Sequence, residues 1–448
     1  MLQLQMWRGE LPASGVALFA ELIADLPQSY RPVIRPAIAK QSSTLGIESP
    51  ELLATHRPGI SLRSVASDLV AGEVIRKGDA VFVIDVRSPR QSSLFALESD
   101  AADSEPEMSD NLIVRVSAIG RRIPESAITT MIALVKETMK VDLEPFRFRS
   151  SEFERLQTEF GEPLQELDEV DIEAASHLTD PDLRTLAIAV ASSGGLLVGD
   201  LDRQLRKEAK HRTEALREEL ERTGLASTEI VVVCRKTSSQ VARVPTLEDL
   251  QQMADGGLRC ACGRSVVEER IEEALGLTGV GKSLLDGSRW LSLLLVRELL
   301  AVGIPLDSIL IEQEMGGDEV DCIANMNGEL VLFELKDKEF SLGNAYSFGA
   351  KMGIIRPKHP VVATTQRVAE DAKEHFQRAA SAGRPRQRLY YDDEGQPNPV
   401  RYIEGIDQLR PGIERLMSEI NQKDAADILE RVLSSAVIDT SAVVSHLS

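Results

Sequence analysis

The sequence lacks any apolar run of the ~18 residues that a membrane-spanning helix requires, although 43% of its 448 residues are hydrophobic. Its first residues, MLQLQMWRGELP, have no basic start and no apolar core followed by a small-residue cleavage site, as a secretory signal peptide has. We therefore expect a cytoplasmic protein without a membrane partner. A chain of this length exceeds one ordinary hydrophobic core, so we expect two or three domains.

Cysteine and positive charge are also scarce. The four cysteines are irregularly spaced, which is typical of a reducing compartment and not of a disulfide framework. The net charge of −20 argues against general binding to polyanions, because neutralising phosphates takes clustered lysine and arginine. Basic residues nevertheless outnumber acidic ones between Lys351 and Arg401. This local excess predicts a basic face, with Lys351 as a nucleic-acid contact.

Residues 1–165 mix helix and strand signals and form an N-terminal α/β region to which we assign no function. VALFAELIADL (16–26) is typical of an amphipathic helix, and AVFVIDV (80–86) of a buried strand. The segment 87–110 is rich in serine and acidic residues and predicts a disordered loop.

Residues 166–258 predict three helices followed by two short strands. Asp180 is a candidate N-cap for the first helix, and Gly224 ends the third. The strands EIVVVCRK (229–236) and QVARV (240–244) flank a Thr-Ser-Ser turn.

This order of elements resembles a winged helix-turn-helix domain, in which the third helix usually enters the major groove of DNA. By that resemblance, Arg212 and Arg217 on the third helix would contact nucleic acid. A winged helix used for protein contact or dimerisation is the alternative, and the glutamates on the same helix would repel phosphates.

Residues 259–448 predict a mixed β-sheet with helices on both sides and a helical tail, so the whole chain is expected to be an α/β multidomain protein. The expected helices are 266–275, 288–303, 341–353 and 366–380, and the expected strands are 308–314, 319–325, 329–335, 360–365 and a short one near 400–406.

An Asn327-Gly328 pair separates two of these strands. Such a pair between two apolar runs is the strongest short signal of a β-hairpin with a type I′ turn. Residues 319–326 and 329–336 are therefore expected to pair antiparallel.

Three charged side chains converge on this hairpin. Because side chains alternate along a strand, Glu334 and Lys336 share one face, and Asp321 on the partner strand reaches the same end. Two carboxylates, an ammonium group and the Leu335 carbonyl then meet in an oxygen-rich pocket of the kind that Mg²⁺ accepts.

The order E-V-D (319–321) followed by E-L-K (334–336) resembles the PD-(D/E)xK nuclease superfamily, with its restriction-endonuclease-like fold. The resemblance covers roughly residues 285–380. It implies that Asp321 and Glu334 ligate Mg²⁺ or Mn²⁺ with help from the Leu335 carbonyl, and that Lys336 orients or activates the attacking water. The structural alternative is a surface hairpin whose charged groups are solvated and merely paired.

The family often carries a further acid on the helix before the hairpin. Ser292 lies where that acid is expected, and Glu298, two turns further on, is a candidate substitute. Many active relatives manage with the hairpin acids alone.

The segment GLTGVGKS (276–283) satisfies the phosphate-loop pattern G-x-x-x-x-G-K-[ST]. A real phosphate loop needs a buried strand directly before it, whereas the preceding EERIEEAL (268–275) predicts a charged helix. We therefore favour a glycine-rich turn between two helices. A nucleotide switch dependent on Lys282 is the competing hypothesis.

Cys234, Cys260 and Cys262 raise the question of zinc. Structural zinc usually takes paired thiolates on each side, and here one side has C-A-C and the other a single cysteine. No fourth ligand is evident in the sequence, so buried or incidental cysteines are favoured and zinc stays open.

We therefore expect a metal-dependent nuclease that hydrolyses phosphodiester bonds, with DNA as substrate and Mg²⁺ or Mn²⁺ as cofactor. By analogy alone, nuclease domains joined to DNA-binding modules suggest prokaryotic defence or DNA processing, with a homodimer as a candidate assembly. The alternative is a non-catalytic DNA-binding or regulatory protein on a nuclease-like scaffold. The missing helix acid and the acidic net charge favour this alternative.

Overall fold

The structure, a computed structural model, describes residues 1–34, 69–88, 111–160, 169–315, 318–381, 399–433 and 444. All but the first two residues of the loop expected at 87–110 lie outside these ranges. The chain forms two compact units: unit 1 is Met1–Ser151, Met326–Glu329 and Gly412–Ser448, and unit 2 is Glu152–Asn325 and Leu330–Pro411. Among the described helices, none combines the length and apolarity needed to cross a membrane.

Unit 1 is built on a six-stranded antiparallel sheet with the strand order β2-β3-β4-β5-β1-β6. Its strands are β1 (Gln3–Leu11), β2 (Arg31–Pro32), β3 (Leu69–Lys77), β4 (Ala80–Arg87), β5 (Leu112–Gly120) and β6 (Glu144–Phe146). The predicted strand at AVFVIDV is confirmed as β4, and every one of its residues is buried. A strand buried on both faces needs cover on both sides of the sheet.

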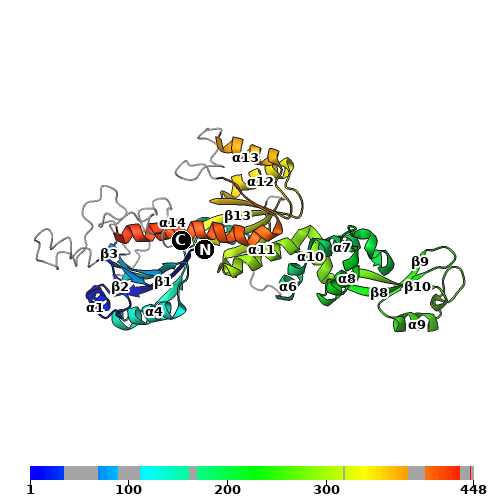
Figure 1. Ribbon diagram of the computed structural model, residues 1–448, viewed down its shortest axis with the longest axis horizontal. Helices are drawn as coiled ribbons and strands as arrows, with labels where there is room; N and C mark the ends of the chain where they lie inside the picture. Colours follow the sequence, from blue (N-terminus) through cyan, green and yellow to red (C-terminus); the bar gives the residue numbers. More distant parts are fainter. Residues whose placement is uncertain are drawn as a thin grey trace, which may run out of the picture. The chain divides into compact units, whose positions relative to one another are not determined.

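Helices supply that cover (Figure 1). The short 3₁₀ helix η1 (Ala13–Ala17) leads into α1 (Leu18–Ala24), which packs beside α4 (Glu125–Met139) on one face of the sheet. Helix α14 (Leu409–Leu433) covers the other face, where Ile428, Leu429 and Val432 pack against Met6 and Val83.

The division into units differs from the expected domain boundaries at the C-terminus. The helical tail was expected to belong with residues 259–448, but from Gly412 onward it clusters with the sheet of unit 1. The physical reason is the apolar stripe of α14, which has its buried partners on β1, β3 and β4.

The first part of unit 2 joins a group of helices to a four-stranded sheet with the order β7-β10-β8-β9. The helices are α6 (Glu169–His177), α7 (Pro181–Ser192), η3 (Val198–Gln204), η4 (Lys210–Arg212), α8 (Thr213–Arg222), α9 (Leu247–Asp255), η5 (Val266–Glu268) and α10 (Gly279–Leu285). The preceding helix α5 (Ser151–Phe160) instead packs Phe153 and Leu156 into the core of the five-stranded sheet described below. The strands are β7 (Leu196–Leu197), β8 (Ala226–Val233), β9 (Gln240–Val244) and β10 (Arg270–Leu277).

Local sequence signals account for most of these elements. Asp180 caps α7, as expected, by accepting hydrogen bonds from the backbone N–H groups of Asp182 and Leu183. Gly224 follows α8 at φ +72°, which ends that helix. The expected second helix is present as the 3₁₀ helix η3.

The helix predicted at 266–275 is wrong. Only η5 is helical, and β10 then pairs antiparallel with β8 along its whole length and with β7 at two positions. The charged face of EERIEEAL suggested a helix, but two neighbouring strands supply the backbone hydrogen bonds and bury Ala274 and Leu275. Tertiary pairing overrides a local preference of this size.

The second part of unit 2 is a five-stranded mixed sheet with the order β11-β12-β13-β14-β15. Its strands are β11 (Ile309–Met315), β12 (Asp318–Met326), β13 (Glu329–Lys336), β14 (His359–Thr364) and β15 (Arg401–Glu404). Strands β11 and β12 are antiparallel, whereas β14 runs parallel to both β13 and β15. The mixed C-terminal sheet is thus present.

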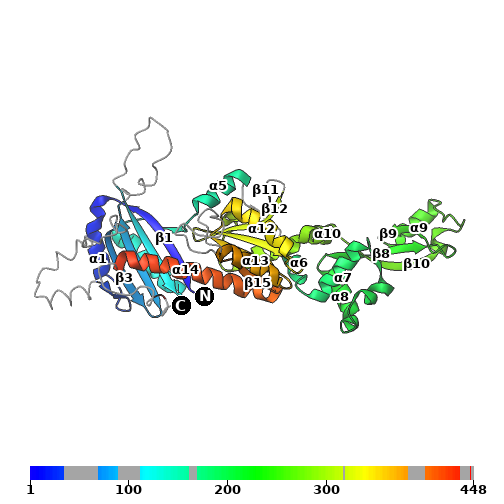
Figure 2. The same ribbon diagram turned by 90° about the horizontal axis from the view of Figure 1, so that it is seen from above.

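Helices flank this sheet on both sides. Helices α12 (Leu342–Ile355) and α13 (Glu370–Ser381) cover one face, on which they pack against Leu330 and Leu332 (Figure 2). Helix α11 (Arg289–Ala301) lies across the other face (Figure 1). The turn between β12 and β13 places Asn327 at φ +51° and Gly328 at φ +86°, the two positive values that a type I′ turn requires.

Candidate active site on the β12–β13 hairpin

The hairpin brings Asp321, Glu334 and Lys336 together. The Lys336 Nζ atom lies 2.9 Å from Glu334 Oε1 and 3.6 Å from Asp321 Oδ2. The Leu335 N–H donates a hydrogen bond to Asp321 Oδ2 at 2.5 Å, which fixes that carboxylate across the strand pair. Because both carboxylates contact one ammonium group, they face the same small space.

Lys351 completes this group from α12. Its side chain is buried, and its Nζ donates to Glu334 Oε2 at 2.7 Å. The sequence suggested an exposed nucleic-acid contact at Lys351, whereas the structure places it behind Glu334. Glu334, only 2% exposed, therefore has one lysine on each carboxylate oxygen.

Burial and charge shift the ionisation of this cluster. Burial, reinforced by the nearby Glu334 charge, raises the pKa of Asp321 to about 6. Burial by itself lowers the pKa of Lys336, but the carboxylates of Asp321 and Glu334 outweigh it, so that this pKa is raised. Lys336 thus stays cationic, while Asp321 can exchange a proton near neutral pH.

The backbone directs a further oxygen toward β12. The Leu335 N–H points to β12, while the Lys336 carbonyl accepts a hydrogen bond from the Thr365 N–H on the opposite side. Successive residues of a strand turn their backbone groups to opposite neighbours, so the Leu335 carbonyl also points to β12. Carboxylates and a carbonyl are hard oxygen ligands of the kind that Mg²⁺ and Mn²⁺ take in proteins.

The end of β13 is firmly held just beyond Lys336. Asp337 accepts hydrogen bonds from Trp290 Nε1 at 3.3 Å and from Thr365 Oγ1 at 2.9 Å. Arg184 pairs with the same carboxylate at 3.3 Å and stacks over the Trp290 ring at 4.9 Å from its centroid. Packing of this kind keeps the Lys336 backbone in one position.

Ser292 and Glu298 are the two α11 positions at which a further acid was expected, and neither supplies an acid to the hairpin. Ser292 is buried. Glu298 is paired with Arg297 at 2.6 Å and with Arg410 at 2.9 Å. Burial opposes ionisation of Glu298, but its two arginine partners outweigh this and lower its pKa.

Glu312 on β11 is an acid that sequence reasoning missed. It pairs with Arg289 at 3.3 Å and contacts Ser292, so it lies beside the helix position where an acid was expected. Burial raises its pKa. The only local signal is an acid within the apolar strand SILIEQE, which does not reveal the side chain's neighbours.

The arginines predicted to contact nucleic acid already have acidic partners. Arg212 pairs with Asp180 at 2.5 Å and with Asp182 at 2.9 Å. Arg217 pairs with Glu214 at 2.5 Å, and a second glutamate, Glu221, lies 3.7 Å away. The positive charges of Arg212 and Arg217 are therefore balanced within the protein.

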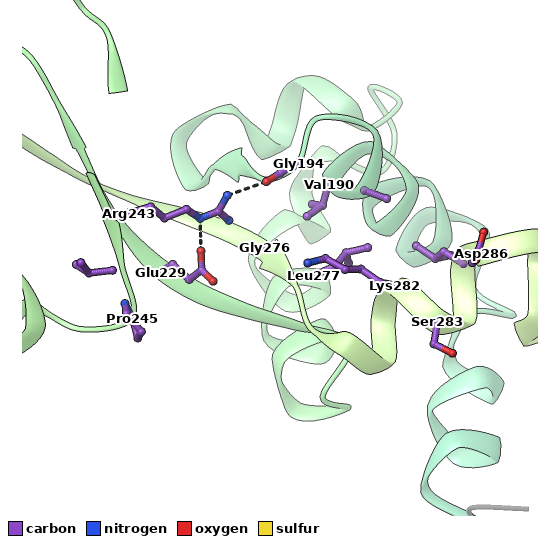
Figure 3. A pocket seen from close by; sticks show the side chains of 13 residues that line it. Val190, Gly194, Glu229, Arg243, Pro245, Gly276, Leu277, Lys282, Ser283 and Asp286 are labelled. Atoms are coloured by element: carbon purple, nitrogen blue, oxygen red, sulfur yellow. Dashed lines mark hydrogen bonds and ion pairs between the residues drawn. The ribbon is translucent and has the colours of Figure 1, made fainter. Parts of the chain in front are cut away.

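A pocket of about 820 Å³ adjoins the GLTGVGKS segment (Figure 3). Lys282 and Ser283 line one side. On the other side, Arg243 pairs with Glu229 and donates to the Gly194 carbonyl at 2.7 Å.

This segment does not form a phosphate loop. A strand does precede it, contrary to expectation, but Gly276 and Leu277 are themselves paired residues of β10. Only Thr278 separates β10 from α10, so no glycine-rich loop presents its N–H groups to a phosphate. A Cβ atom on Gly281 would lie 2.0 Å from the Leu225 carbonyl oxygen, so this glycine serves close packing.

No family model and no curated protein matches the chain. Among solved structures, that of protein VC1899 from Vibrio cholerae aligns with a TM-score of 0.30 and 12% sequence identity. The alignment covers 61% of this chain and 57% of that one, so the chain spans little more than half of that protein's length. A likeness this weak does not bear on function.

Proposed function

We propose that the protein is a metal-dependent nuclease of the PD-(D/E)xK type that hydrolyses phosphodiester bonds in DNA, with a role in prokaryotic defence or DNA processing. One observation carries the proposal: Asp321, Glu334 and Lys336 converge at the end of a rigid hairpin in the order that the superfamily uses. Burying such groups is costly unless a function or a partner compensates for it.

Each residue has a distinct role in this proposal. Asp321, Glu334 and the Leu335 carbonyl would hold Mg²⁺ or Mn²⁺, which when bound supplies Lewis-acid stabilisation of phosphate charge. Lys336 is 24% exposed, so its ammonium group can donate to an attacking water or to a phosphate oxygen. Lys351 is buried behind Glu334 and positions that carboxylate.

The test is cleavage of supercoiled plasmid by the full chain with Mg²⁺ or Mn²⁺. Lys336→Met is compared with Lys338→Met, which removes an exposed lysine two residues further on. We expect cleavage by the wild type and by Lys338→Met, and none by Lys336→Met. Equal cleavage by all three proteins would show that the hairpin is not the active site.

A second candidate is a non-catalytic DNA-binding or regulatory protein. The observation that favours it is charge balance: two carboxylates face two lysines, and Ser292 stands where relatives often carry a third acid. This candidate predicts DNA binding by the folded protein without cleavage in either metal ion.

The resemblance to a winged helix makes α8 a second candidate DNA-binding element. Because Arg212 and Arg217 have carboxylate partners, a phosphate has to replace an existing ion pair at either residue. We therefore propose only a supporting role for these two arginines in DNA binding, with a protein-contact surface as the alternative use of this domain.

A further inference from the structure

Three cysteines and a glutamate from separate segments meet beside the β8–β9 hairpin. Cys234 directly follows β8, Cys260 and Cys262 lie between α9 and η5, and Glu269 precedes β10. Their sulfur and carboxylate ligand atoms all lie within 4.8 Å of one another. Cys234, Cys260 and Glu269 are buried, and Cys262 is half-buried.

Two tight turns hold the first and second cysteines in the same way. The Cys234 N–H donates to the Ser239 carbonyl, and its own carbonyl accepts from the Ser238 N–H. Likewise, the Cys260 N–H donates to the Arg264 carbonyl, and its carbonyl accepts from the Gly263 N–H. Each cysteine thus begins a closed turn, so its position is set by backbone hydrogen bonds.

Glu269 links the two turns. One carboxylate oxygen accepts from the Arg235 N–H at 2.7 Å, and the other accepts from the Cys262 thiol at 2.7 Å. Glu269 is only 2% exposed, and the charge of Arg264 helps to stabilise it, but within the described chain no lysine or arginine forms an ion pair with it. A buried carboxylate surrounded by thiols is a costly arrangement unless a cation joins them.

The ligand set indicates the kind of cation. Thiolates favour zinc over magnesium or calcium, and four protein ligands form the closed tetrahedral shell of a structural site. Ligand atoms ~2.3 Å from a shared ion are roughly 3.8 Å apart in a tetrahedron. This separation agrees with the four ligand atoms lying within 4.8 Å of one another. An iron–sulfur cluster places its ligands on separate iron atoms and needs a wider cage.

The apolar core beside the cluster is small. It consists of four buried residues, Val232, Val244, Leu250 and Val266, with five partly buried ones packed against them, Ile230, Val241, Ala242, Ala254 and Val267. A segment with a core of this size is stabilised further by a staple such as a metal ion. Figure 2 shows α9 beside β9 and β10, and the four ligands lie at the end of β8, in the loop after α9 and just before β10.

We propose that Cys234, Cys260, Cys262 and Glu269 bind one structural zinc ion. The ion fastens the end of β8 to the 260–262 loop and to the start of β10. Coordination deprotonates the three thiols and replaces the hydrogen bond from Cys262 to Glu269 with two bonds to the ion. This site is independent of the hairpin site, and its test does not depend on nuclease activity.

The experiment measures zinc in the purified full chain by elemental analysis and follows its release with a chromogenic chelator after thiol modification. We expect about one zinc ion per wild-type chain and a loss of at least tenfold in zinc content in Cys260→Ala. The control Cys322→Ala, which removes the buried cysteine of β12, should keep its zinc.

The glutamate is tested separately. Glu269→Gln preserves the shape of the side chain and removes its charge, and we expect at least tenfold weaker zinc binding. Glu248→Gln, an exposed change on α9, should bind zinc as the wild type does.

Replacing zinc by Co²⁺ in the wild-type chain provides a readout that needs no variant. We expect the intense visible absorption of tetrahedral, thiolate-bound Co²⁺. A folded wild-type protein that takes up neither zinc nor Co²⁺, or that contains a disulfide among these cysteines, would overturn the proposal. Full zinc content in Cys260→Ala would do the same.

Discussion

The β12–β13 and β8–β9 hairpins both gather buried polar groups, but they do so in opposite surroundings. At the end of β12–β13, two carboxylates face two lysines within a large apolar core that includes α12 and α13. Beside β8–β9, three thiols and a carboxylate meet over a core of four buried residues.

The first site lies in a core that is stable without it, whereas the second site stabilises the segment around it. The charges of the first cluster balance one another, so the surrounding sheet can form before any ion arrives. The second cluster has no balancing lysine or arginine ion pair among the described residues, and the core beside it is small, so a bound metal ion would add to its stability. We infer that the first cluster can form without a bound ion, whereas the second cluster stabilises its segment only once an ion binds.

The sharpest test of this comparison is Glu334→Gln. We expect plasmid cleavage to fall by on the order of a thousandfold, because the change removes a proposed metal ligand and the partner of two lysines. Zinc content should not change. Initial cleavage rates and elemental analysis of the same preparation measure both outcomes, and Glu248→Gln serves as the control for rate.

The next largest effect concerns the two cores. Leu332→Ala should lower the free energy of unfolding of unit 2 by about 2–5 kcal/mol, because Leu332 is fully buried between strands and helices. Leu250→Ala should instead open only the segment around α9, with a larger effect after zinc removal. Amide hydrogen exchange measured along the chain distinguishes the effects of the two substitutions. Faster exchange throughout unit 2 in Leu250→Ala would contradict the comparison.

The third effect is a pH dependence at Asp321. Because its pKa is raised to about 6, a proton competes with Mg²⁺ or Mn²⁺ below that pH. Metal affinity should therefore fall up to about tenfold per pH unit below about pH 6 and level off above it. Calorimetric titration of Mn²⁺ at several pH values measures this. Asp321→Asn should bind more weakly and lose most of that pH dependence.

The same raised pKa has a consequence for folding. The folded state holds the Asp321 proton more tightly than the unfolded state does, so this group favours folding at low pH. That contribution disappears as the pH rises through about 6. Denaturant titrations of metal-free wild type and Asp321→Asn at pH values on either side of 6 test the sign.

The smallest effect is expected on α8. Arg217→Ala should weaken DNA binding no more than about fivefold, because binding there exchanges one exposed ion pair for another. Arg222→Ala, which removes a more exposed arginine of the same helix, is the matched control. Fluorescence anisotropy at two salt concentrations measures both. A tenfold loss for Arg217→Ala alone would make α8 the principal DNA-binding element.

Local signals predicted much of the fold and of the hairpin site. The Asn327-Gly328 turn, the capping by Asp180 and the two-residue alternation of Glu334 and Lys336 act over a few residues, so they can be read from sequence. These signals place the three charged groups on one hairpin without knowledge of the rest of the chain.

The features that sequence reasoning missed depend on distant partners. β10 forms because β7 and β8 pair with it, which its own charged residues do not reveal. Glu269 becomes a candidate ligand only when this strand is formed, and Lys351 meets Glu334 only when α12 packs on the sheet. In each case the deciding contact joins segments far apart in sequence.

The close approach of Gly281 to the Leu225 carbonyl has a consequence for protein engineering. Converting GLTGVGKS into a working nucleotide loop would require inserting residues between β10 and α10, not changing side chains. Helix α10 would then have to move away from Leu225, and the packing of Gly281 against the Leu225 carbonyl would be lost. The pairing of Gly276 and Leu277 within β10, and not the spacing of the motif, is therefore what prevents this segment from forming a phosphate loop.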